Sequence, residues 1–516
     1  MRICRLVLIL LLGAAPCAMA CSQLQAGTSF WVRLSGPISS YSAQPGTPVH
    51  GTLLESPLCD GASLLPIHIP VEGFVVSAHR VGLGLVHETA TLQIEFRSIK
   101  PGDAPPIEIH GQVAEVDNAR EAVKKGVIHG IRSTETPQGE ISSRLKYLPS
   151  WHLYPDPFLM GYKLLFPVFP EPEIYLPAGT DLRVELLQDA DLPAELTPPA
   201  PIPSPAENEE QDVAATLNQL PARTVDKKHR EADLIDMAFV GSKEELMGAF
   251  EAAGWKRSDT VSGRTILHQF RAFLAKTSYS SAPMSRQWFT GREPDMTLEK
   301  TFDSYGKRDH LRIWRLEQTA AGAPLWAAAA VRETGATLSV KQLGFMHHVS
   351  EDLDEERESI LRDLVAADCV KSESLVDRPA IKHVMVNATG ELLRTDGRVM
   401  MLHLKTCDTP GNGGKQAESF RPGSRFSRYL RKEILTVRSD LFRANAVYAL
   451  FDLTAITVKF FRHNSASRAE MRSVEAQASP VLGNGYGITP ESFPAGTESV
   501  CAPDSAPCSF GFNEFY

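Results

Sequence analysis

The sequence predicts an α+β multidomain protein with an N-terminal β-barrel or sandwich module, a Pro-rich linker, and a mixed α/β module that ends in a helical C-terminal extension. Three observations predict this class. Short, partly alternating apolar segments between Gly, Pro and Asp breaks fill residues 26–190. Six prolines then fall between positions 193 and 205, a density at which neither a helix nor a sheet continues. Strand and helix patterns follow one another from residue 233 onward.

The first residues have the pattern of a secretory signal peptide, predicted over residues 1–20. Arg2 and Arg5 flank an apolar run over residues 6–12, and small residues ending in Ala20 precede Cys21. The run is shorter than the roughly twenty residues that a permanent membrane helix needs. Residues 18–21 also fit a degenerate lipobox, in which Cys21 is the acylated first residue. We therefore expect an exported protein, periplasmic or associated with the cell envelope, with simple cleavage and a lipid anchor at Cys21 as open alternatives.

The composition is that of an ordinary globular protein and argues against nucleic-acid binding. The chain of 516 residues has 53 Lys and Arg against 62 Asp and Glu, a net charge of −9, whereas nucleic-acid binding needs a basic excess. Six of its eight Cys lie beyond the predicted signal. In an oxidising compartment six Cys permit three disulfides in fifteen pairings, and acylation of Cys21 would leave one thiol over. Cys501 and Cys508 are the nearest pair.

Residues 21–190 are predicted to form the β-rich domain. Ala-Gly-Thr at residues 26–28 precedes the strand pattern of residues 29–34, and Pro-Ala-Gly-Thr at residues 177–180 precedes a second clear strand pattern. A glycine that enters a strand in this way typically supplies a special backbone angle. The phrase resembles the strand openings of envelope β-barrel modules in conjugation and type IV secretion scaffold proteins. That resemblance implies scaffolding or surface interaction rather than catalysis. The polar residues 117–121 are interpreted as a solvated turn.

A Pro-rich acidic linker is predicted over residues 191–232, followed by the α/β module over residues 233–410. Residues 234–240 have the pattern of a strand. Ser242 and Glu245 then have the spacing of a capping box, and Gly254 is typical of a left-handed helix stop. The module therefore opens with a strand and a capped helix.

Several phrases of this module occur in the order of a known family. They are residues 234–240, Ala253-Gly254-Trp255, Gly291-Arg292, residues 308–314, His347-His348 before residues 354–357, and residues 395–398. Together they resemble the LssY-like C-terminal domain over about residues 233–404. The resemblance implies a cell-envelope context, since such domains often follow membrane segments, and it implies a fold unit without a defined reaction.

A polar constellation in this module raises two hypotheses about its chemistry. Alternation places His310, Arg312 and Trp314 on one face of a strand. Imidazoles beside carboxylates can hold a divalent metal that activates water against a phosphoester or lipid-like anionic substrate. The candidate metal ligands are His310, His347, His348, Asp352 and Asp354. The candidate anion-binding residues are Arg292, Arg308 and Arg312, which would act through charge-assisted hydrogen bonds.

A structural role for the same residues is the favoured interpretation. Ser350 is predicted as the N-cap of a helix, and the acids that follow it are expected to be solvated and to complement the helix dipole. Leu353, Ile360, Leu361, Leu364 and Val365 would form the buried stripe. No H-E-x-x-H, G-x-S-x-G or phosphate-binding loop motif occurs in the sequence. The leading function is thus a non-enzymatic envelope protein that binds or scaffolds. A metal-assisted hydrolase is the alternative, and no catalytic residue or cofactor is assigned.

Residues 411–477 are predicted to form a basic helical extension, and residues 478–516 a flexible tail. Seven Arg and Lys against Glu433 and Asp440 give residues 421–443 a net charge of +5. One hypothesis is an amphipathic segment on an anionic membrane surface. A core helix with a solvated arginine face is the favoured alternative. The expected partners are therefore envelope proteins or an anionic membrane surface, and no nucleic acid.

Overall fold

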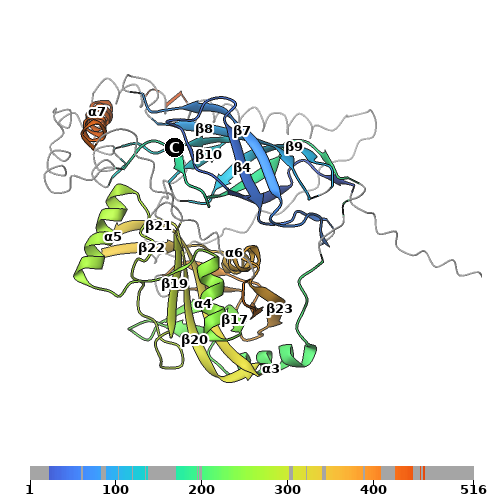
Figure 1. Ribbon diagram of the computed structural model, residues 1–516. Helices are drawn as coiled ribbons and strands as arrows, with labels where there is room; N and C mark the ends of the chain where they lie inside the picture. Colours follow the sequence, from blue (N-terminus) through green and yellow to red (C-terminus); the bar gives the residue numbers. More distant parts are fainter. Residues whose placement is uncertain are drawn as a thin grey trace, which may run out of the picture. The chain divides into compact units, whose positions relative to one another are not determined.

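The structure is a computed structural model that describes residues 22–59, 62–82, 89–102, 104–118, 120–133, 135–136, 170–193, 196, 200–301, 306–320, 322–339, 344–387, 390–407, 425–444, 454 and 457–458. Most of the elements among them are strands, accompanied by five helices, α3 to α7. The strands form two large sheets, one in the first part of the chain and one after the predicted linker (Figure 1). The predicted α+β multidomain class is confirmed.

The first large sheet closes into a β-barrel. Six strands follow one another in the order β8-β7-β4-β2-β13-β9, and β9 pairs with β8 to complete the ring. Of the two predicted alternatives, barrel and sandwich, the chain therefore has the barrel. The six strands are β2 (Ser29–Leu34), β4 (Pro48–Leu53), β7 (Pro70–His79), β8 (Thr91–Ile99), β9 (Ile107–Val116) and β13 (Asp181–Leu186).

The barrel core is built by period-two alternation. Along β8, the side chains of Leu92, Ile94 and Phe96 are buried and the intervening ones are only partly buried, as expected for a strand with one face toward a core. Gly27 and Gly179 both enter their strands with positive φ, 87° and 90°, which confirms the role predicted for them. The remaining strands of this region are β1 (Gln23–Leu24), β3 (Ile38–Ser39), β5 (Leu58–Cys59), β6 (Ala62–Ser63), β10 (Ala122–Lys124), β11 (Val127–His129), β12 (Tyr175–Leu176) and β14 (Ala190–Asp191).

The segment predicted as a linker contains a helix. Helix α3 (Glu207–Asn218) follows the prolines, and its Val213 and Leu217 are buried in the core of the second sheet. The sequence of α3 is mostly polar, and only these two side chains form its buried contact. Because the segment is acidic and its apolar face is short, the sequence did not predict this helix. After α3, β15 (Arg223–Val225) pairs with β16 (Glu231–Leu234).

The second large sheet is open and mixed. Its strands lie in the order β18-β19-β20-β21-β17-β26-β23, with β22 paired to β21. Strands β17 and β26 are parallel, and the other pairs are antiparallel. The strands are β17 (Met237–Val240), β18 (Lys256–Arg257), β19 (Met296–Thr301), β20 (Arg308–Ala320), β21 (Ala323–Ser339), β22 (Gly344–Val349), β23 (Val370–Asp377) and β26 (Arg398–Leu404). A separate hairpin joins β24 (Val384–Val386) and β25 (Leu392–Arg394).

Helices cover both faces of this sheet. Helices α4 (Lys243–Ala252) and α6 (Leu353–Ala366) pack on one face, and α3 on the other. The predicted capping box of Ser242 and Glu245 begins α4, and Gly254 has a positive φ after its end. The predicted strand over residues 234–240 is divided into β16 and β17. Helix α5 (Gly263–Ala275) lies apart, with a small apolar cluster of its own.

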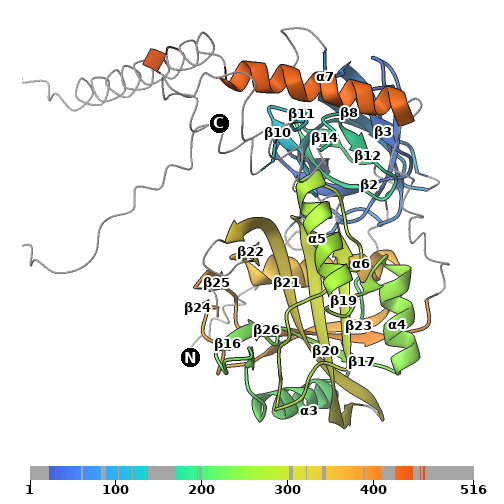
Figure 2. The same ribbon diagram turned by 90° about the vertical axis from the view of Figure 1, so that its left-hand side faces the viewer.

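Helix α7 (Arg425–Ala444) lies within the predicted basic extension. It packs against the barrel through Leu435, which is part of the barrel core (Figure 2). Arg431 of α7 also pairs with Glu171 at 3.2 Å and with Glu173. Among the described residues, no helix combines the length and the apolar character that crossing a membrane requires.

Candidate functional site

The predicted alternation of β20 is confirmed, and it brings His310 into a buried group of charges. The Nδ1 atom of His310 lies 3.3 Å from Glu333 of β21, and its Nε2 atom lies 3.7 Å from Glu299 of β19. Arg308 donates two hydrogen bonds to Glu333, at 3.0 and 2.6 Å. Burial raises the pKa of Glu299 to about 8, although Arg308 opposes the rise. His310 is thus held between two carboxyl groups, both of which also lie close to Arg308.

The other two candidate anion-binding arginines contact groups of the chain itself. Arg312 donates a hydrogen bond of 2.6 Å to Asp233 and two of 3.1 Å to Ser285. Arg292 donates to the backbone oxygen of Arg315 at 2.6 Å. Arg312 is buried, so its charge serves a contact inside the fold.

The remaining candidate metal ligands whose side chains are described each contact a different group of the chain. His348 lies 3.2 Å from Glu391, whereas His347 occupies the adjacent position of β22 and its side chain lies outside the described residues. Asp352, and not Ser350, caps α6 by accepting the backbone N–H groups of Asp354 and Glu355. The predicted cap at Ser350 was therefore wrong by two residues, because β22 ends at Val349 and α6 begins only at Leu353.

Asp354 has a further structural contact. It accepts the Thr395 hydroxyl at 2.8 Å and the Asp396 backbone N–H at 2.7 Å. Across the part of the chain that the structure describes, no three His, Cys, Asp or Glu side chains gather as a metal site would require. The five candidate metal ligands are thus not brought together by their described side chains.

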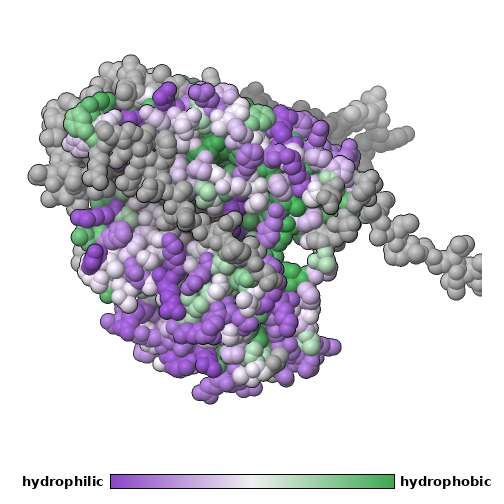
Figure 3. All heavy atoms as spheres, viewed as in Figure 1, coloured by the Kyte–Doolittle hydropathy of each residue, from purple (hydrophilic) through white to green (hydrophobic). Residues whose placement is uncertain are grey.

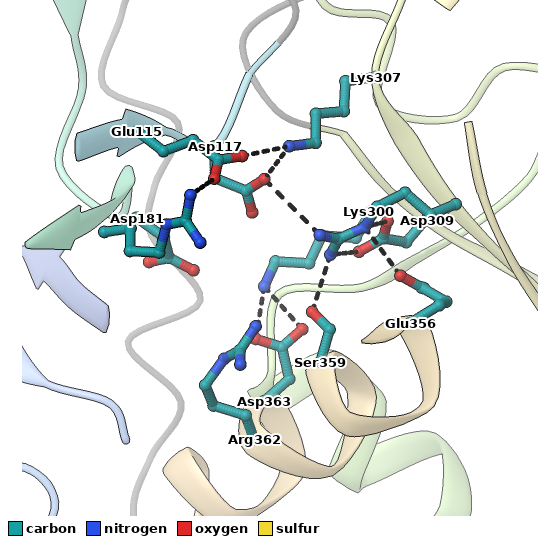
Figure 4. Close-up of polar contacts among 12 residues, drawn as sticks. Glu115, Asp117, Asp181, Lys300, Lys307, Asp309, Glu356, Ser359, Arg362 and Asp363 are labelled. Carbon is teal, nitrogen blue, oxygen red and sulfur yellow. Dashed lines mark hydrogen bonds and ion pairs between the residues drawn. The ribbon is translucent and has the colours of Figure 1, made fainter. Parts of the chain in front are cut away.

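The most highly charged buried group lies on the other face of β20 and β21, around Arg332. Arg332 donates to both oxygens of Asp309 at 2.9 and 3.1 Å, to Glu356 of α6 at 2.9 Å, and to Ser359 at 2.8 Å (Figure 4). Burial and the neighbouring Asp309 raise the pKa of Glu356 well above its usual range. Burial also raises the pKa of Asp309, against the attraction of Arg332. Burial thus disfavours a negative charge on both acids, and Arg332 donates hydrogen bonds to both of them.

This group extends to the barrel. Asp117, directly after β9, lies 2.5 Å from Lys307 and 3.8 Å from Arg332. Burial opposes the charge of Asp117, but Arg332 and Lys307 outweigh it, and the pKa of Asp117 is lowered. The interpretation of residues 117–121 as a solvated turn was wrong, because Asp117, Asn118 and Glu121 are buried.

A second ionic contact joins the barrel to α6. Asp363 accepts Lys300 at 2.6 and 2.7 Å and Arg33 of β2 at 3.1 Å, and Trp255 donates to it at 3.1 Å. Arg33 is in turn bound by Asp181 of β13 at 2.7 and 2.8 Å. Burial opposes ionisation of Asp363, but Lys300 and Arg33 lower its pKa to about 2. The barrel and the second sheet are therefore joined by paired, buried charges, which we call the interdomain ion network: Arg33, Asp117, Asp181, Lys300, Lys307, Asp309, Arg332, Glu356 and Asp363.

A disulfide bond is present among the described residues. The sequence permitted fifteen pairings of six Cys and did not select this one. Cys369, at the end of α6, is bonded to Cys407, after β26. The suggested pair Cys501 and Cys508, and the candidate lipid attachment site Cys21, lie outside the described residues. The disulfide ties the last helix of the sheet region to its last strand.

Helix α7 has an exposed apolar face. Phe426, Tyr429, Leu430 and Ile434 are 74, 63, 48 and 40% exposed, and their spacing places them on one side of the helix. A hydrophobic area over α7 is visible at the upper left of Figure 3. Arg438 is buried. The predicted core helix is confirmed by Leu435, whereas the exposed side chains that are described on α7 are largely apolar and not arginines.

One family comparison matches the second sheet region. Residues 217–399 match the model of the family described as LssY C-terminus, and no curated protein matches the chain. The matched range begins at the end of α3 and ends within β26, so it includes most of the strands that carry the buried charges. The chain therefore carries a domain of the LssY C-terminus family.

Proposed function

We propose that the chain is an exported, non-enzymatic binding protein of the cell envelope, whose barrel and LssY C-terminus domain form one supporting body. One observation carries the proposal. Each member of the predicted polar constellation whose side chain is described already bonds to another part of the chain. Structural ion-pair networks bond their charges within the fold in this way, and this favours a structural role for the constellation over a substrate site.

Export is supported by the sequence pattern at residues 1–20 and by the Cys369–Cys407 bond. Disulfides persist in oxidising compartments and are rare in the reducing cytosol. Cell fractionation tests this part of the proposal. We expect the mature chain in the envelope fraction with Cys369 and Cys407 unreactive to a thiol reagent, whereas a reduced chain retained in the cytoplasm would contradict export.

The competing function is a metal-assisted hydrolase acting on an anionic phosphoester or lipid-like substrate. Metal content separates the two functions, because a hydrolase of this type needs its ligands around one ion. We expect the purified chain, dialysed without chelator, to hold no stoichiometric divalent ion. One equivalent that is retained by the wild type and lost from the His347→Ala, His348→Ala double variant or from His310→Ala would overturn the non-enzymatic proposal.

The binding surface that we propose is the exposed face of α7, and its partner is an anionic membrane surface. Phe426, Leu430 and Ile434 can enter the boundary between headgroups and acyl chains, as amphipathic interfacial helices do. Residues 421–443 have a net charge of +5. A basic residue near an anionic surface contributes about 1 kcal/mol, although the paired Arg431 and the buried Arg438 are not available for this contact. The match of apolar face and positive charge favours a membrane over a neutral protein surface.

Vesicle co-sedimentation of the purified full chain tests this surface. We expect binding to vesicles that contain anionic lipid, weaker binding to zwitterionic vesicles, and a loss of at least about tenfold in affinity for Phe426→Ser/Leu430→Ser. The matched control is Val384→Ser/Val386→Ser, which removes two exposed apolar side chains of β24 (51 and 53% exposed). Equal binding by both double variants would show that α7 is not the membrane surface.

A further inference from the structure

Helix α5 forms one wall of a crevice that the proposed function does not use. The crevice has a volume of about 610 Å³ and lies between α5 and the residues around Tyr279. From α5 it is lined by Thr265 and by Arg264, Leu267, His268 and Arg271. The last three are spaced three, four and seven residues from Arg264, which places these four on one face of the helix. A continuous strip of two guanidiniums, one imidazole and one aliphatic side chain therefore faces this space.

The two arginines of this strip differ from those of the buried charge groups. Neither Arg264 nor Arg271 forms a hydrogen bond or ion pair with any described residue, and both are exposed. Asp259 is the acid of the lining, so two guanidiniums and one carboxylate leave a formal charge of +1, with His268 counted as neutral. In a chain of net charge −9, a locally positive hollow favours an anionic ligand.

The opposite wall is held in place by aromatic stacking and hydrogen bonds. The rings of His268 and Tyr279 are stacked, with centroids 4.0 Å apart. The Tyr279 hydroxyl donates to Asp259 at 2.7 Å, and the Ser281 hydroxyl donates to the same oxygen at 3.0 Å. Burial and Asp259 raise the pKa of Tyr279, so the phenol keeps its proton. One oxygen of Asp259 thus accepts two hydroxyl donors, and Asp259 forms no ion pair with either arginine.

We propose that this crevice binds an organic phosphate, with Arg264 and Arg271 holding the phosphate group and Leu267 and the His268–Tyr279 stack contacting its organic part. The Cα atoms of the two arginines are about 10 Å apart along the helix, a span over which two long side chains converge on one anion. Arginine recognises phosphate through paired, charge-assisted hydrogen bonds. The aliphatic and aromatic surface between the arginines explains why the ligand carries an apolar group and is not a bare ion.

Neighbouring exposed apolar residues extend this surface. Leu267, within the strip, is 50% exposed, and Val261, two residues before α5, is 62% exposed. The phosphate therefore belongs either to a soluble ester or to a lipid headgroup whose acyl chain lies over these residues. Both sources share the phosphate chemistry, and the experiment below separates them.

Titration calorimetry of the purified full chain tests the site with three probes: phenyl phosphate, inorganic phosphate and benzyl alcohol. We expect saturable binding of phenyl phosphate, at least about tenfold weaker binding of inorganic phosphate, and none of benzyl alcohol. Arg264→Ala/Arg271→Ala should weaken phenyl phosphate binding at least about tenfold. The matched control, Arg394→Ala, removes an arginine that is 61% exposed and should leave binding unchanged. Absence of phenyl phosphate binding, or binding that survives the double variant, would overturn the proposal.

A second experiment, which measures binding to vesicles, identifies the source of the phosphate. It uses vesicles with phosphatidic acid and a chain that already carries Phe426→Ser/Leu430→Ser, so that α7 no longer contributes. Additional loss of vesicle binding in Arg264→Ala/Arg271→Ala would assign the site to a lipid headgroup. Unchanged vesicle binding, with phenyl phosphate binding lost, would assign it to a soluble ester. The two helices carry separate variants, so failure of the α7 proposal and failure of the crevice are distinguishable.

Discussion

The barrel and the LssY C-terminus domain place their charges differently. The barrel core consists of apolar side chains, and Asp117 and Asp181, its buried acids in the interdomain ion network, lie at strand ends. The LssY C-terminus domain instead carries Arg308, Asp309 and Arg332 on central strands of its sheet. In a closed barrel every strand edge is paired, and apolar side chains fill the core. The open sheet meets α6 and the barrel through charges that must be paired.

This difference predicts which changes lower the stability of each region. An aliphatic core loses stability in proportion to the volume removed, and the loss does not depend on pH. A buried ion pair contributes little net stability while intact, yet removing one partner leaves the other charge buried and uncompensated. The LssY C-terminus domain should therefore respond sharply to charge changes and to pH. The barrel should respond chiefly to changes of volume.

The largest expected effect follows from Arg332→Met. This substitution leaves Asp309, Glu356 and Asp117 without the guanidinium that they share. We expect a loss of about 3–5 kcal/mol in the free energy of unfolding at neutral pH, and a smaller loss at acidic pH, where the acids are protonated. Urea unfolding followed by circular dichroism over a range of pH measures both quantities.

The matched barrel variant is Leu182→Ala. Leu182 is fully buried in β13, and its truncation should cost about 2–5 kcal/mol by the same amount at each pH. A loss for Arg332→Met that is equally independent of pH would break the contrast between the two regions.

The next effect concerns the Cys369–Cys407 bond, which closes a sequence separation of 38 residues within the LssY C-terminus domain. Cys369→Ala/Cys407→Ala should lower the free energy of unfolding by about 3–4 kcal/mol, because the unfolded chain gains freedom when the loop opens. Calorimetry with and without reductant checks this value. The reductant should destabilise the wild type and leave the double variant unchanged; an equal response of both chains would point to another disulfide as the source.

The sequence predicted those features that depend on neighbours along the chain. The strand face of His310 and Arg312, the capping box of Ser242, and the glycine turn before β13 each arise from residues a few positions apart. The partners of the buried charges could not be predicted in this way. Asp309 stands opposite Arg332 only through the register of β20 and β21, and Asp117 approaches them from the barrel.

Helix α6 shows why burial itself was missed. Its Glu356 and Asp363 lie outside the predicted apolar stripe, yet both are buried. The helix packs on the sheet through Ile360 and Leu364, while Asp363 is covered from a second side by Arg33 of the barrel. A hydrophobic stripe reports one contact face, and it carries no information on a second face that is made by a distant domain.

A smaller effect is expected for Asp363→Asn, which weakens the contact between the two regions. The amide retains the shape but not the charge that Lys300 and Arg33 bind, so we expect a loss of about 1.5–3 kcal/mol. The pKa of Asp363 is lowered to about 2. Its contribution is therefore present above about pH 4 and lost as the pH falls toward 2, and the variant should lack this acid-sensitive part. Asp368→Asn, at a half-exposed pair with Lys405, is the control and should cost less than about 1 kcal/mol.

The smallest effect in mild acid is expected for Glu299→Gln, and it isolates the pH response of the LssY C-terminus domain. Burial raises the pKa of Glu299 to about 8, so the folded chain retains a proton that the unfolded chain releases near pH 4.5. The stability that this proton provides is complete below about pH 4.5 and is lost progressively as the pH rises through about 8. Glutamine keeps the neutral form, and Arg308 keeps Glu333 as its partner. The variant should therefore differ from the wild type by no more than about 1 kcal/mol in mild acid, and it should become the more stable chain as the pH rises from about 4.5 to about 8. A wild-type stability that runs parallel to that of Glu299→Gln across this range would show that Glu299 is charged in the folded chain, and the domain would then tolerate an ionised carboxylate where burial disfavours one.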